Sequence, residues 1–474
     1  MTIKSFLRKT AGVLSAAVIA VSSAVFSSSA ADKRQKLPSN DAMSIVDAMG
    51  AGWNLGNAFD ASDCTWLTDE LGYESAWCGA KTTKKLIRSV RAAGFSTIRV
   101  PVSWHNHVDS DLKISEAWMT RVKEVIDWCM DEDLYVILNV HHDVAKGFYY
   151  PSSSEYAVSE NYMKKIWSQI CDKFGSYSDR LIFEAINEPR PTEASNPWWY
   201  DANNIPDEYR DYLESINRLN QVFVDTVRAS GKKNAKRFLL VGGFATAGDN
   251  RGVLSPVFEM PEDTAKNRLI ADVHYYGIGA RSSLELIDKL YDSFTSKGIP
   301  IAVTEYGLNE NGYKYFDKTD IAAVRMSEFF SYARARGISV ILWDNNWGKK
   351  GLDNCHKFID RATGKVVLPE IVNAVVDAGA PSLLKSYNDA LTVHASASST
   401  EVKLTWNKVG RASKYAVYQY KNGKFVLISD KVTKTSATVK GLKSGKTLKF
   451  AVIANVNGKW TKLSEDNVIT VKTS

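Results

Sequence analysis

Cysteine is scarce in this sequence, and the few cysteines follow no spacing that binds metal. There are 5 cysteines in 474 residues, without a CxxC pair or a Cys/His cluster, which argues against a structural zinc site. Cys129 and Cys171 lie in helical patterns and are expected to be buried thiols. Cys64 and Cys78 flank one loop and can pair if the protein matures in an oxidising compartment, a point that the sequence leaves open.

Polar low-complexity tracts are also absent, and the body of the chain has no net positive charge. The formal net charge is +7, but residues 391–474 carry 15 Lys/Arg against 4 Asp/Glu, and three more basic residues lie near the N-terminus. The remaining body is therefore acidic, at about −7, which argues against a nucleic-acid-binding groove there. The 13 Trp and 21 Tyr are abundant by contrast. Because these side chains stack on sugar rings, they mildly favour a carbohydrate partner.

The first 31 residues have the three parts of a secretory signal peptide. A basic start is followed by an apolar stretch from Ala11 to Phe26 and by small residues up to Ala31. We expect cleavage after Ala30 or Ala31. A transmembrane anchor is the alternative, but the apolar run is short and interrupted by serines. The sequence therefore predicts an exported, extracellular protein with no membrane contact after cleavage.

Short apolar runs alternate with long amphipathic ones from about Asn40 to Ala380. The predicted strands are Gly50–Leu55, Thr97–Val100, Tyr135–Val140, Leu181–Glu184, Phe238–Val241, Leu269–Val273, Ile301–Thr304 and Val340–Trp343. The predicted helices between them include Lys81–Ala93, Glu116–Met130, Glu160–Phe174, Tyr209–Ser230, Ser283–Lys297 and Thr319–Arg336. This alternation predicts an α/β fold, a (β/α)8 TIM barrel over residues 32–380. A doubly wound sheet would also alternate, but no GxGxxG follows the first strand.

Chemically active side chains follow almost every predicted strand. In a barrel the C-terminal ends of the strands meet at one mouth, so these side chains are expected to gather there. They are Trp53 and Asn54, Arg99, His141 and His142, Asn187 and Glu188, His274 and Tyr276, Glu305, and Trp343. Any one of them has a structural explanation, but core packing does not explain seven of eight strand ends.

Glu188 and Glu305 are carboxylates at two different strand ends, which is what cleavage of a glycosidic bond requires. One carboxyl group protonates the leaving oxygen while the other attacks the anomeric carbon, and a retaining pair lies about 5–5.5 Å apart. Asn187 precedes Glu188 and is placed to hold a sugar hydroxyl, which suits an acid/base. Arg99 and Tyr276 are candidate partners that would keep Glu305 ionised as a nucleophile.

This set of residues resembles glycoside hydrolase family 5, a retaining family with its acid/base and nucleophile on the fourth and seventh barrel strands. The match covers roughly residues 40–380, and the segments Gly52–Asn57, Val102–His107 and Val140–Asp143 further resemble the endo-glucanase subfamily 4. The resemblance implies that Glu188 is the acid/base and Glu305 the nucleophile. It implies substrate-binding roles for Arg99, His141, Asn187, His274, Tyr276 and Trp343, and we expect His142, Trp53 and Asn54 in the same cleft.

An insertion at Pro191–Pro206 follows Glu188 directly and carries Trp198, Trp199 and Tyr200. Its position predicts that it borders the leaving-group side of the site. Two interpretations are open: the aromatic rings stack on glucosyl units, or the loop is simply buried on the rim of the barrel.

Beyond Ala380 the pattern changes to alternation by twos. Residues 381–390 read as a linker, and residues 391–474 predict a small β-sandwich that resembles a fibronectin type III module. Trp406 and Tyr415 are expected in its core, and Trp460 is the better candidate for an exposed ring. The basic surface of this module either contacts cell-wall polymers or only keeps the module solvated.

The sequence thus predicts a secreted, monomeric, retaining endo-β-1,4-glucanase whose partner is a β-glucan polysaccharide. Cellulose-like, mixed-linkage and xyloglucan chains are the candidate substrates, and a β-mannanase or xylanase is the alternative within the family. A non-catalytic carbohydrate-binding protein is the alternative from another class, although both carboxylates are present. No cofactor, metal or nucleic acid is expected, since the mechanism uses two carboxylates alone.

Overall fold

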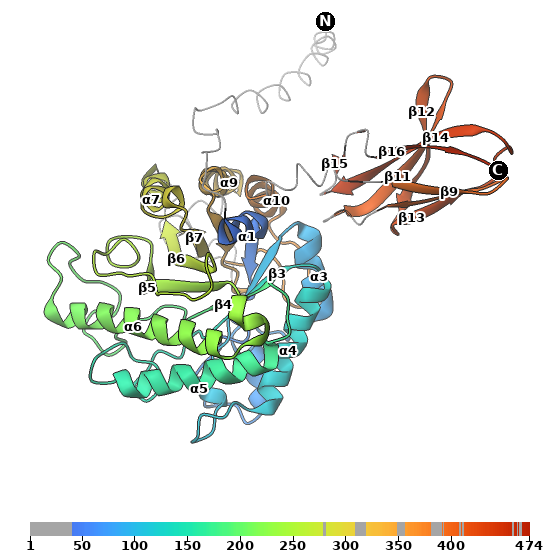
Figure 1. Cartoon of the computed structure of the whole chain (residues 1–474). Helices are drawn as coiled ribbons and strands as arrows, with labels where there is room; N and C mark the ends of the chain where they lie inside the picture. Colours follow the sequence, from blue (N-terminus) through green and yellow to red (C-terminus); the bar gives the residue numbers. More distant parts are fainter. Residues whose placement is uncertain are drawn as a thin grey trace, which may run out of the picture. The chain divides into compact units, whose positions relative to one another are not determined.

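In the computed structural model, eight parallel strands close into a barrel in sequence order, as the alternation predicted (Figure 1). The structure describes residues 40–277, 281–308, 319–347, 356–380, 391, 393–406, 409, 412–456, 459–461, 463 and 467–474. The predicted signal peptide and the predicted linker lie outside the described residues. The strands are β1 (Ala51–Asn54), β2 (Thr97–Val100), β3 (Tyr135–Asn139), β4 (Leu181–Glu184), β5 (Leu239–Ala247), β6 (Leu269–Gly277), β7 (Ile301–Leu308) and β8 (Ser339–Leu342).

Three of the described helices around the barrel, α1, α3 and α4, begin at a capping side chain. Thr83 accepts a hydrogen bond from the Leu86 backbone N–H at the start of α3, and Ser115 does the same for Trp118 at the start of α4. The helices are α1 (Asp41–Met49), α2 (Tyr73–Ala76), α3 (Lys84–Ala93), α4 (Glu116–Asp131), α5 (Tyr156–Phe174), α6 (Asp207–Ala229), α7 (Arg281–Ser293), α9 (Thr319–Ala335) and α10 (Pro369–Ala378). Short 3₁₀ turns are η2 (Glu70–Gly72), η3 (His105–His107), η4 (Lys232–Lys236) and η5 (Thr295–Lys297).

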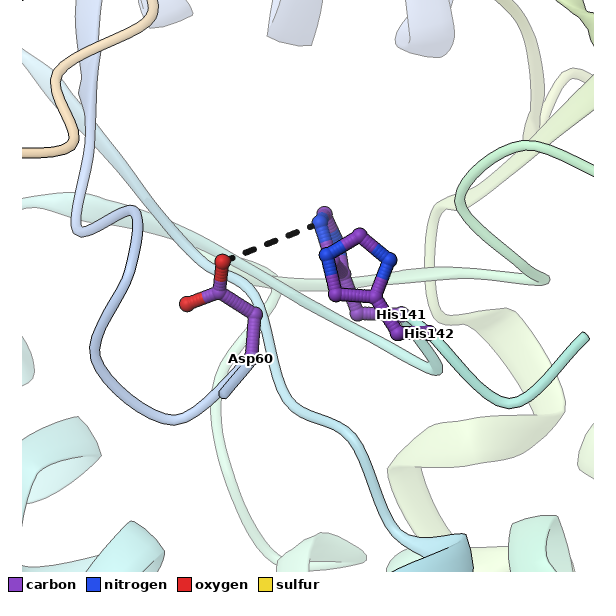
Figure 2. A group of neighbouring side chains, drawn as sticks. All are labelled: Asp60, His141 and His142. Atoms are coloured by element: carbon purple, nitrogen blue, oxygen red, sulfur yellow. Dashed lines mark ion pairs between the residues drawn. The ribbon is translucent and has the colours of Figure 1, made fainter. Parts of the chain in front are cut away.

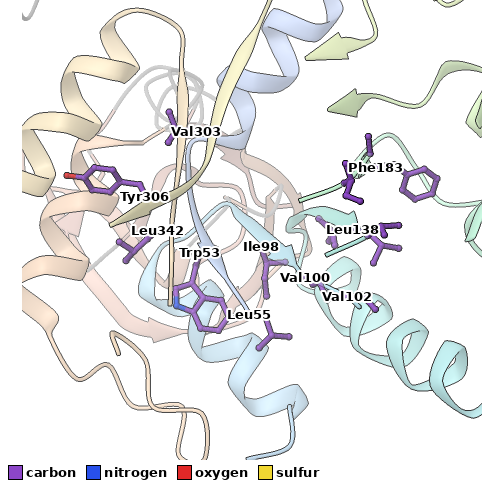
Figure 3. Packing of buried hydrophobic residues seen from close by; sticks show 14 of the residues in the cluster. Trp53, Leu55, Ile98, Val100, Val102, Leu138, Phe183, Val303, Tyr306 and Leu342 are labelled. Carbon is purple, nitrogen blue, oxygen red and sulfur yellow. The ribbon is translucent and has the colours of Figure 1, made fainter. Parts of the chain in front are cut away.

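Alternation along the strands sorts side chains between the two faces of the barrel wall. Ile98, Val100, Leu138 and Phe183 belong to the large core outside the wall, where they pack with the helices (Figure 3). Their neighbours along each strand therefore point into the barrel. Whether a side chain can reach the mouth therefore depends on which face of its strand it occupies.

The lower interior of the barrel is apolar and is closed by α1. Ile137, Ile182, Leu240 and Ile341 form a buried cluster there with Val46 and other residues of α1. Gly52 leaves room for this layer, because a Cβ at that position would lie 2.9 Å from Ile341 side-chain atoms. At the next inward-facing position along the strands the interior residues are polar, and this polar layer forms the floor of the site.

Strands β5, β6 and β7 run beyond their predicted ends. Their pairing contains irregularities, for instance between Gly242 and Ala247 on β5 and between Val273 and His274 on β6. Irregular pairing changes the direction of side chains at the rim of a barrel. A prediction from strict alternation therefore ends these strands too early. This is why His274, Tyr276 and Glu305 lie within strands rather than in the loops after them.

The C-terminal part folds into two antiparallel sheets with a core of its own, as expected for a β-sandwich. One sheet has the order β13-β10-β9, and the other has β12-β11-β14-β15 with β16 against β14. Trp406 and Tyr415 pack edge to face in the core, and Trp460 is 38% exposed, in agreement with the sequence pattern. The strands are β9 (Val393–Ala397), β10 (Val402–Trp406), β11 (Ala412–Lys421), β12 (Lys424–Val432), β13 (Ser436–Val439), β14 (Thr447–Val456), β15 (Lys459–Trp460) and β16 (Val468–Lys472).

The four described cysteines are all buried free thiols. Cys129 and Cys171 are buried as predicted, and the open question of pairing is answered because Cys64 and Cys78 each direct their sulfur to backbone carbonyls. Within the described residues, a search for helices of sufficient length and hydropathy to span a membrane finds none.

A buried arginine, Arg237, fixes the chain where it enters β4. Its Nε donates to Asn234 Oδ1 at 2.7 Å, and burial lowers its pKa to about 10. The guanidinium donates to the backbone carbonyls of Phe174, Tyr177, Ser178 and Leu181. These bonds join the end of α5 to the start of β4.

We predict that Arg237→Met lowers the free energy of unfolding by about 3 kcal/mol, because buried carbonyls would lose their donors. Urea denaturation of the full chain measures this loss. Arg88→Met is the matched control, since Arg88 makes a surface ion pair with Glu132 that contributes at most about 1 kcal/mol. Equal losses in the two variants would contradict the role given to Arg237.

Candidate active site

Arg99 lies at the centre of the barrel mouth and is fully buried. Its Nε and Nη2 donate to both oxygens of Glu184, each at 2.6 Å. Nη1 donates to Asn54 Oδ1 at 3.0 Å and to Glu305 Oε1 at 2.7 Å, and Nη2 also donates to Asn187 Oδ1 at 2.7 Å. Burial lowers the pKa of Arg99, but Glu184 and Glu305 outweigh it and bring the pKa above its ordinary value. One cation therefore orients residues from three strands, β1, β4 and β7.

Glu305 is held by both of its carboxylate oxygens. Arg99 reaches Oε1, and the Tyr276 hydroxyl donates to Oε2 at 2.7 Å. His274 Nδ1 lies 3.6 Å from Oε2. The side chain is only 6% exposed, and both of its oxygens are engaged in short hydrogen bonds. The arrangement presents a fixed carboxylate to the mouth of the barrel.

Glu188 has a different environment from Glu305. Its Oε1 lies 3.0 Å from His274 Nδ1, its Oε2 lies 3.5 Å from Arg190 Nη1, and its side chain is 16% exposed. Burial raises the pKa of Glu188, but the hydrogen bond and charge of His274, with Arg190, bring that pKa below its ordinary value. Burial lowers the pKa of His274, and the charge of Glu305 together with the contact to Glu188 raises it above its ordinary value.

The two carboxylates are close neighbours. An oxygen of Glu188, an oxygen of Glu305 and a nitrogen of His274 all lie within 4.8 Å of one another. An intervening water would need a separation of about 6.5–9.5 Å between the carboxyl groups. Oxygens this close favour direct attack by one carboxylate over attack by an intervening water.

His141, His142 and Trp343 form a second wall of the site. The rings of His141 and Trp343 are parallel, 2° apart in orientation and 6.0 Å between centroids. Asp60 Oδ2 lies 4.0 Å from His141 Nε2, and His142 lies beside them (Figure 2). Gly56 lies against the Trp343 ring, where a Cβ would come within 2.8 Å. The structure brings all three predicted residues to the mouth.

Three residues predicted to bind substrate have no access to it. Trp53 is fully buried, on the outer face of the wall, and its Nε1 donates to Asp344 Oδ2 at 2.9 Å. The prediction that Trp53 lies in the cleft is therefore wrong. Side chains alternate along β1, so Trp53 points outward to the helices and Asn54 points inward. Asn54 and Arg99 are inside but also fully buried. They position Glu305 and Asn187 instead of contacting a ligand.

Several polar residues of the site were missed by the sequence reasoning. Glu184 ends β4 on the inward face and accepts from Arg99 and Asn139. Burial raises the pKa of Asp60 to about 7, and burial with the charge of Glu184 raises that of Asp272 to about 7. For Asp272 the available signal was its position two residues before His274, which places both side chains on the same face of a regular strand. For Asp60, a loop residue, the sequence carried no such signal.

The burial of His142 predicts acid sensitivity of the fold. Burial lowers the pKa of His142 to about 4, whereas an unfolded histidine takes up its proton near pH 6.5. Stability from the neutral ring is therefore fully present above about pH 6.5 and is lost as the pH falls toward 4.

The free energy of unfolding should fall between pH 7 and pH 4. We predict that this fall is about 2 kcal/mol smaller in His142→Gln than in the wild type. Urea denaturation at the two pH values, on variant and wild type, measures the difference. His394→Gln is the control, because His394 is exposed on β9 and should leave the pH dependence unchanged. A His142→Gln protein with the wild-type pH dependence would refute the assignment.

Comparison with known proteins identifies the family. The cellulase model, glycosyl hydrolase family 5, matches residues 60–349. Endoglucanase A of Clostridium longisporum is 31% identical over 395 residues, which cover 79% of this chain and 72% of that protein. A family 5 lichenase variant from Caldicellulosiruptor sp. F32, solved with cellotetraose, has 43% identity and a TM-score of 0.68, covering 73% of this chain and 97% of that one. A broad-specificity endoglucanase from Ruminococcus champanellensis, solved with cellotriose, has 32% identity and a TM-score of 0.63, covering 72% and 100%. With the family model and the relatives in agreement, this chain belongs to glycosyl hydrolase family 5, the cellulase family, and is a glycoside hydrolase.

Proposed function

We propose that this protein is an exported, retaining endo-β-1,4-glucanase in which Glu188 is the acid/base and Glu305 the nucleophile. The observation that carries the proposal is the separation of less than 4.8 Å between an oxygen of Glu188 and an oxygen of Glu305. That spacing is typical of a pair in which one carboxylate attacks the sugar directly.

In the first step a Glu305 oxygen attacks the anomeric carbon, and the bond from that carbon to the leaving oxygen breaks. The leaving oxygen takes a proton from Glu188. Arg99 and Tyr276 hold Glu305 in place throughout, since each donates to one of its oxygens. In the second step Glu188 takes a proton from water, the water oxygen attacks the anomeric carbon, and the ester bond to Glu305 breaks.

His274 is placed to give a proton to Glu188. In the free protein the pKa of Glu188 is lowered and that of His274 is raised, so the proton between them rests on the imidazole. The contact of 3.0 Å from His274 Nδ1 to Glu188 Oε1 allows its transfer to Glu188 when a leaving oxygen arrives. Once the leaving oxygen has taken that proton, Glu188 and His274 are both unprotonated, and Glu188 can accept a proton from the attacking water.

The family and the ligands of two similar structures support a β-glucan as the substrate class. The lichenase and the broad-specificity endoglucanase were solved with cellotetraose and cellotriose, which are β-1,4-linked glucose oligomers. In this chain, His141 and Trp343 supply a flat parallel pair of rings at the mouth, and such rings suit the apolar face of a glucosyl unit.

We predict hydrolysis of carboxymethylcellulose, lichenan and xyloglucan, with a rapid fall in viscosity from internal cleavage. Mannan and xylan assayed side by side complete the panel. Cleavage of mannan or xylan alone would overturn the assignment to β-glucans. Proton NMR of the first products should show the β-anomer, and an initial α-anomer would exclude retention.

Substitution of the two carboxylates should have distinguishable effects. We predict that Glu305→Ala lowers kcat by about 10⁴-fold or more on every substrate, because no covalent intermediate can form. Glu188→Ala should slow polysaccharide cleavage by a similar factor but an activated aryl cellobioside far less, since a good leaving group needs little proton transfer. Glu160→Ala, on the exposed face of α5, is the control. Retained activity in Glu305→Ala would sink the nucleophile assignment.

Export is tested separately from catalysis. N-terminal sequencing of the protein from the culture medium should begin at Ala31 or Asp32, the residues after the two proposed cleavage positions. If the protein is found only in the cells and its N-terminus is intact, the proposal of export is contradicted.

A further inference from the structure

The larger sheet of the C-terminal module has an outer face that is separate from the core of the module. Along β11, Tyr415 and Val417 point into the core, and along β14 Phe450 and Val452 do the same. Because side chains alternate along a strand, the residues between and beyond them point away from the core. The outer face includes Lys414, Tyr418, Tyr420, Phe425, Leu427, Lys449 and Trp460.

One end of the outer face is a row of neighbours across three strands. Tyr420 of β11 pairs with Phe425 of β12, and their rings lie 5.1 Å apart, edge to face. On the other side of Tyr420, the Nζ of Lys449 on β14 lies 5.7 Å from the centre of the ring. Tyr420 is 43% exposed, and Leu427, two residues along β12 from Phe425, is 48% exposed. This end therefore combines an accessible aromatic ring with a cation.

The other end of the outer face has the same combination. Trp460 of β15 pairs with Asn455 of β14, which pairs in turn with Lys414 of β11. The Nζ of Lys414 lies 5.3 Å from the centre of the Trp460 ring, which is exposed. Because Lys414 and Tyr420 are six residues apart on β11, the two pairs of ring and lysine are separated by about 20 Å along the sheet.

The charge of the module indicates which partner suits these rings. Residues 391–474 carry 15 Lys/Arg against 4 Asp/Glu, which gives the module a positive potential. Solvation of the module would require the lysines but not the exposed rings. A neutral glucan would use the rings but not the lysines. A polymer of carboxylated sugars uses both, since its sugar rings stack on aromatic side chains and its carboxylates pair with the neighbouring ammonium groups.

We propose that the outer face binds an acidic polysaccharide, a polymer of carboxylated sugars, at a site independent of the barrel mouth. Single-stranded nucleic acid also combines negative charge with flat rings, but membership of a glycoside hydrolase family favours a polysaccharide. Binding there holds the catalytic barrel on an acidic polymer, whichever substrate the barrel cleaves.

The dissociation constant of the full chain for immobilised polygalacturonate tests this proposal. The fully methyl-esterified polymer is the matched ligand, because it keeps the sugar backbone and loses the charge, and it should bind much more weakly. Lys414→Gln combined with Lys449→Gln should raise the dissociation constant about tenfold, since both lysines lie beside the rings. Lys403→Gln combined with Lys440→Gln removes the same charge from the side of the smaller sheet and should raise it less than about twofold.

The contribution of the rings is measured on Tyr420→Ala and Trp460→Ala, each of which should weaken binding by about fivefold. The proposal is overturned if the wild type does not bind polygalacturonate, if the two double-lysine variants lose affinity equally, or if both aromatic variants bind as the wild type does. Equally tight binding of single-stranded oligothymidine would also overturn it, because the face would then recognise polyanions in general. Hydrolysis is assayed separately, so failure of the proposed function does not affect this result.

Discussion

The contact between the Arg99 guanidinium and its two carboxylates is the interaction on which the barrel mouth depends. A buried cation is costly unless it is paired and fully hydrogen-bonded, and Arg99 has Glu184 on one side and Glu305 on the other. The same bonds that compensate the buried charge also fix the direction of the Glu305 carboxylate. Asn54 and Asn187 complete the donor pattern. Local stability and the orientation of Glu305 thus depend on one set of bonds, so neither is altered without the other.

This network is possible because the barrel interior is divided into layers. Ile137, Ile182 and Ile341 fill the lower layer with α1 against them, which keeps water away from the base of the site. The polar layer above is therefore in a medium of low dielectric, where hydrogen bonds to charged groups are strong and unpaired groups are costly. The raised pKa of Asp272, about 7, is a consequence of that burial and of its neighbour Glu184.

The two carboxylates at the barrel mouth differ in their surroundings. Glu305 is almost inaccessible and tied through both oxygens, whereas Glu188 is more exposed and lies 3.0 Å from His274 Nδ1. Two carboxyl groups in unequal environments are the general means of keeping one ionised while the other exchanges a proton. The insertion extends this asymmetry outward, since Arg190 connects Glu188 to Trp198. The surroundings of Glu188 are therefore built partly from residues outside the barrel strands.

Local pattern alone was sufficient for the barrel, for β2 and β4 at their observed bounds, and for placing Glu188 just after a strand, because periodicity and strand termini are properties of neighbouring residues. Tertiary structure decided the rest. Trp53 is directed outward, and Glu184 inward onto Arg99, by the tilt and register with which the strands close. Asp60 joins the site through a loop whose path no local pattern specifies. The separation of the two carboxylates, on which the chemistry rests, is a distance between strands far apart in sequence, and only barrel closure sets it.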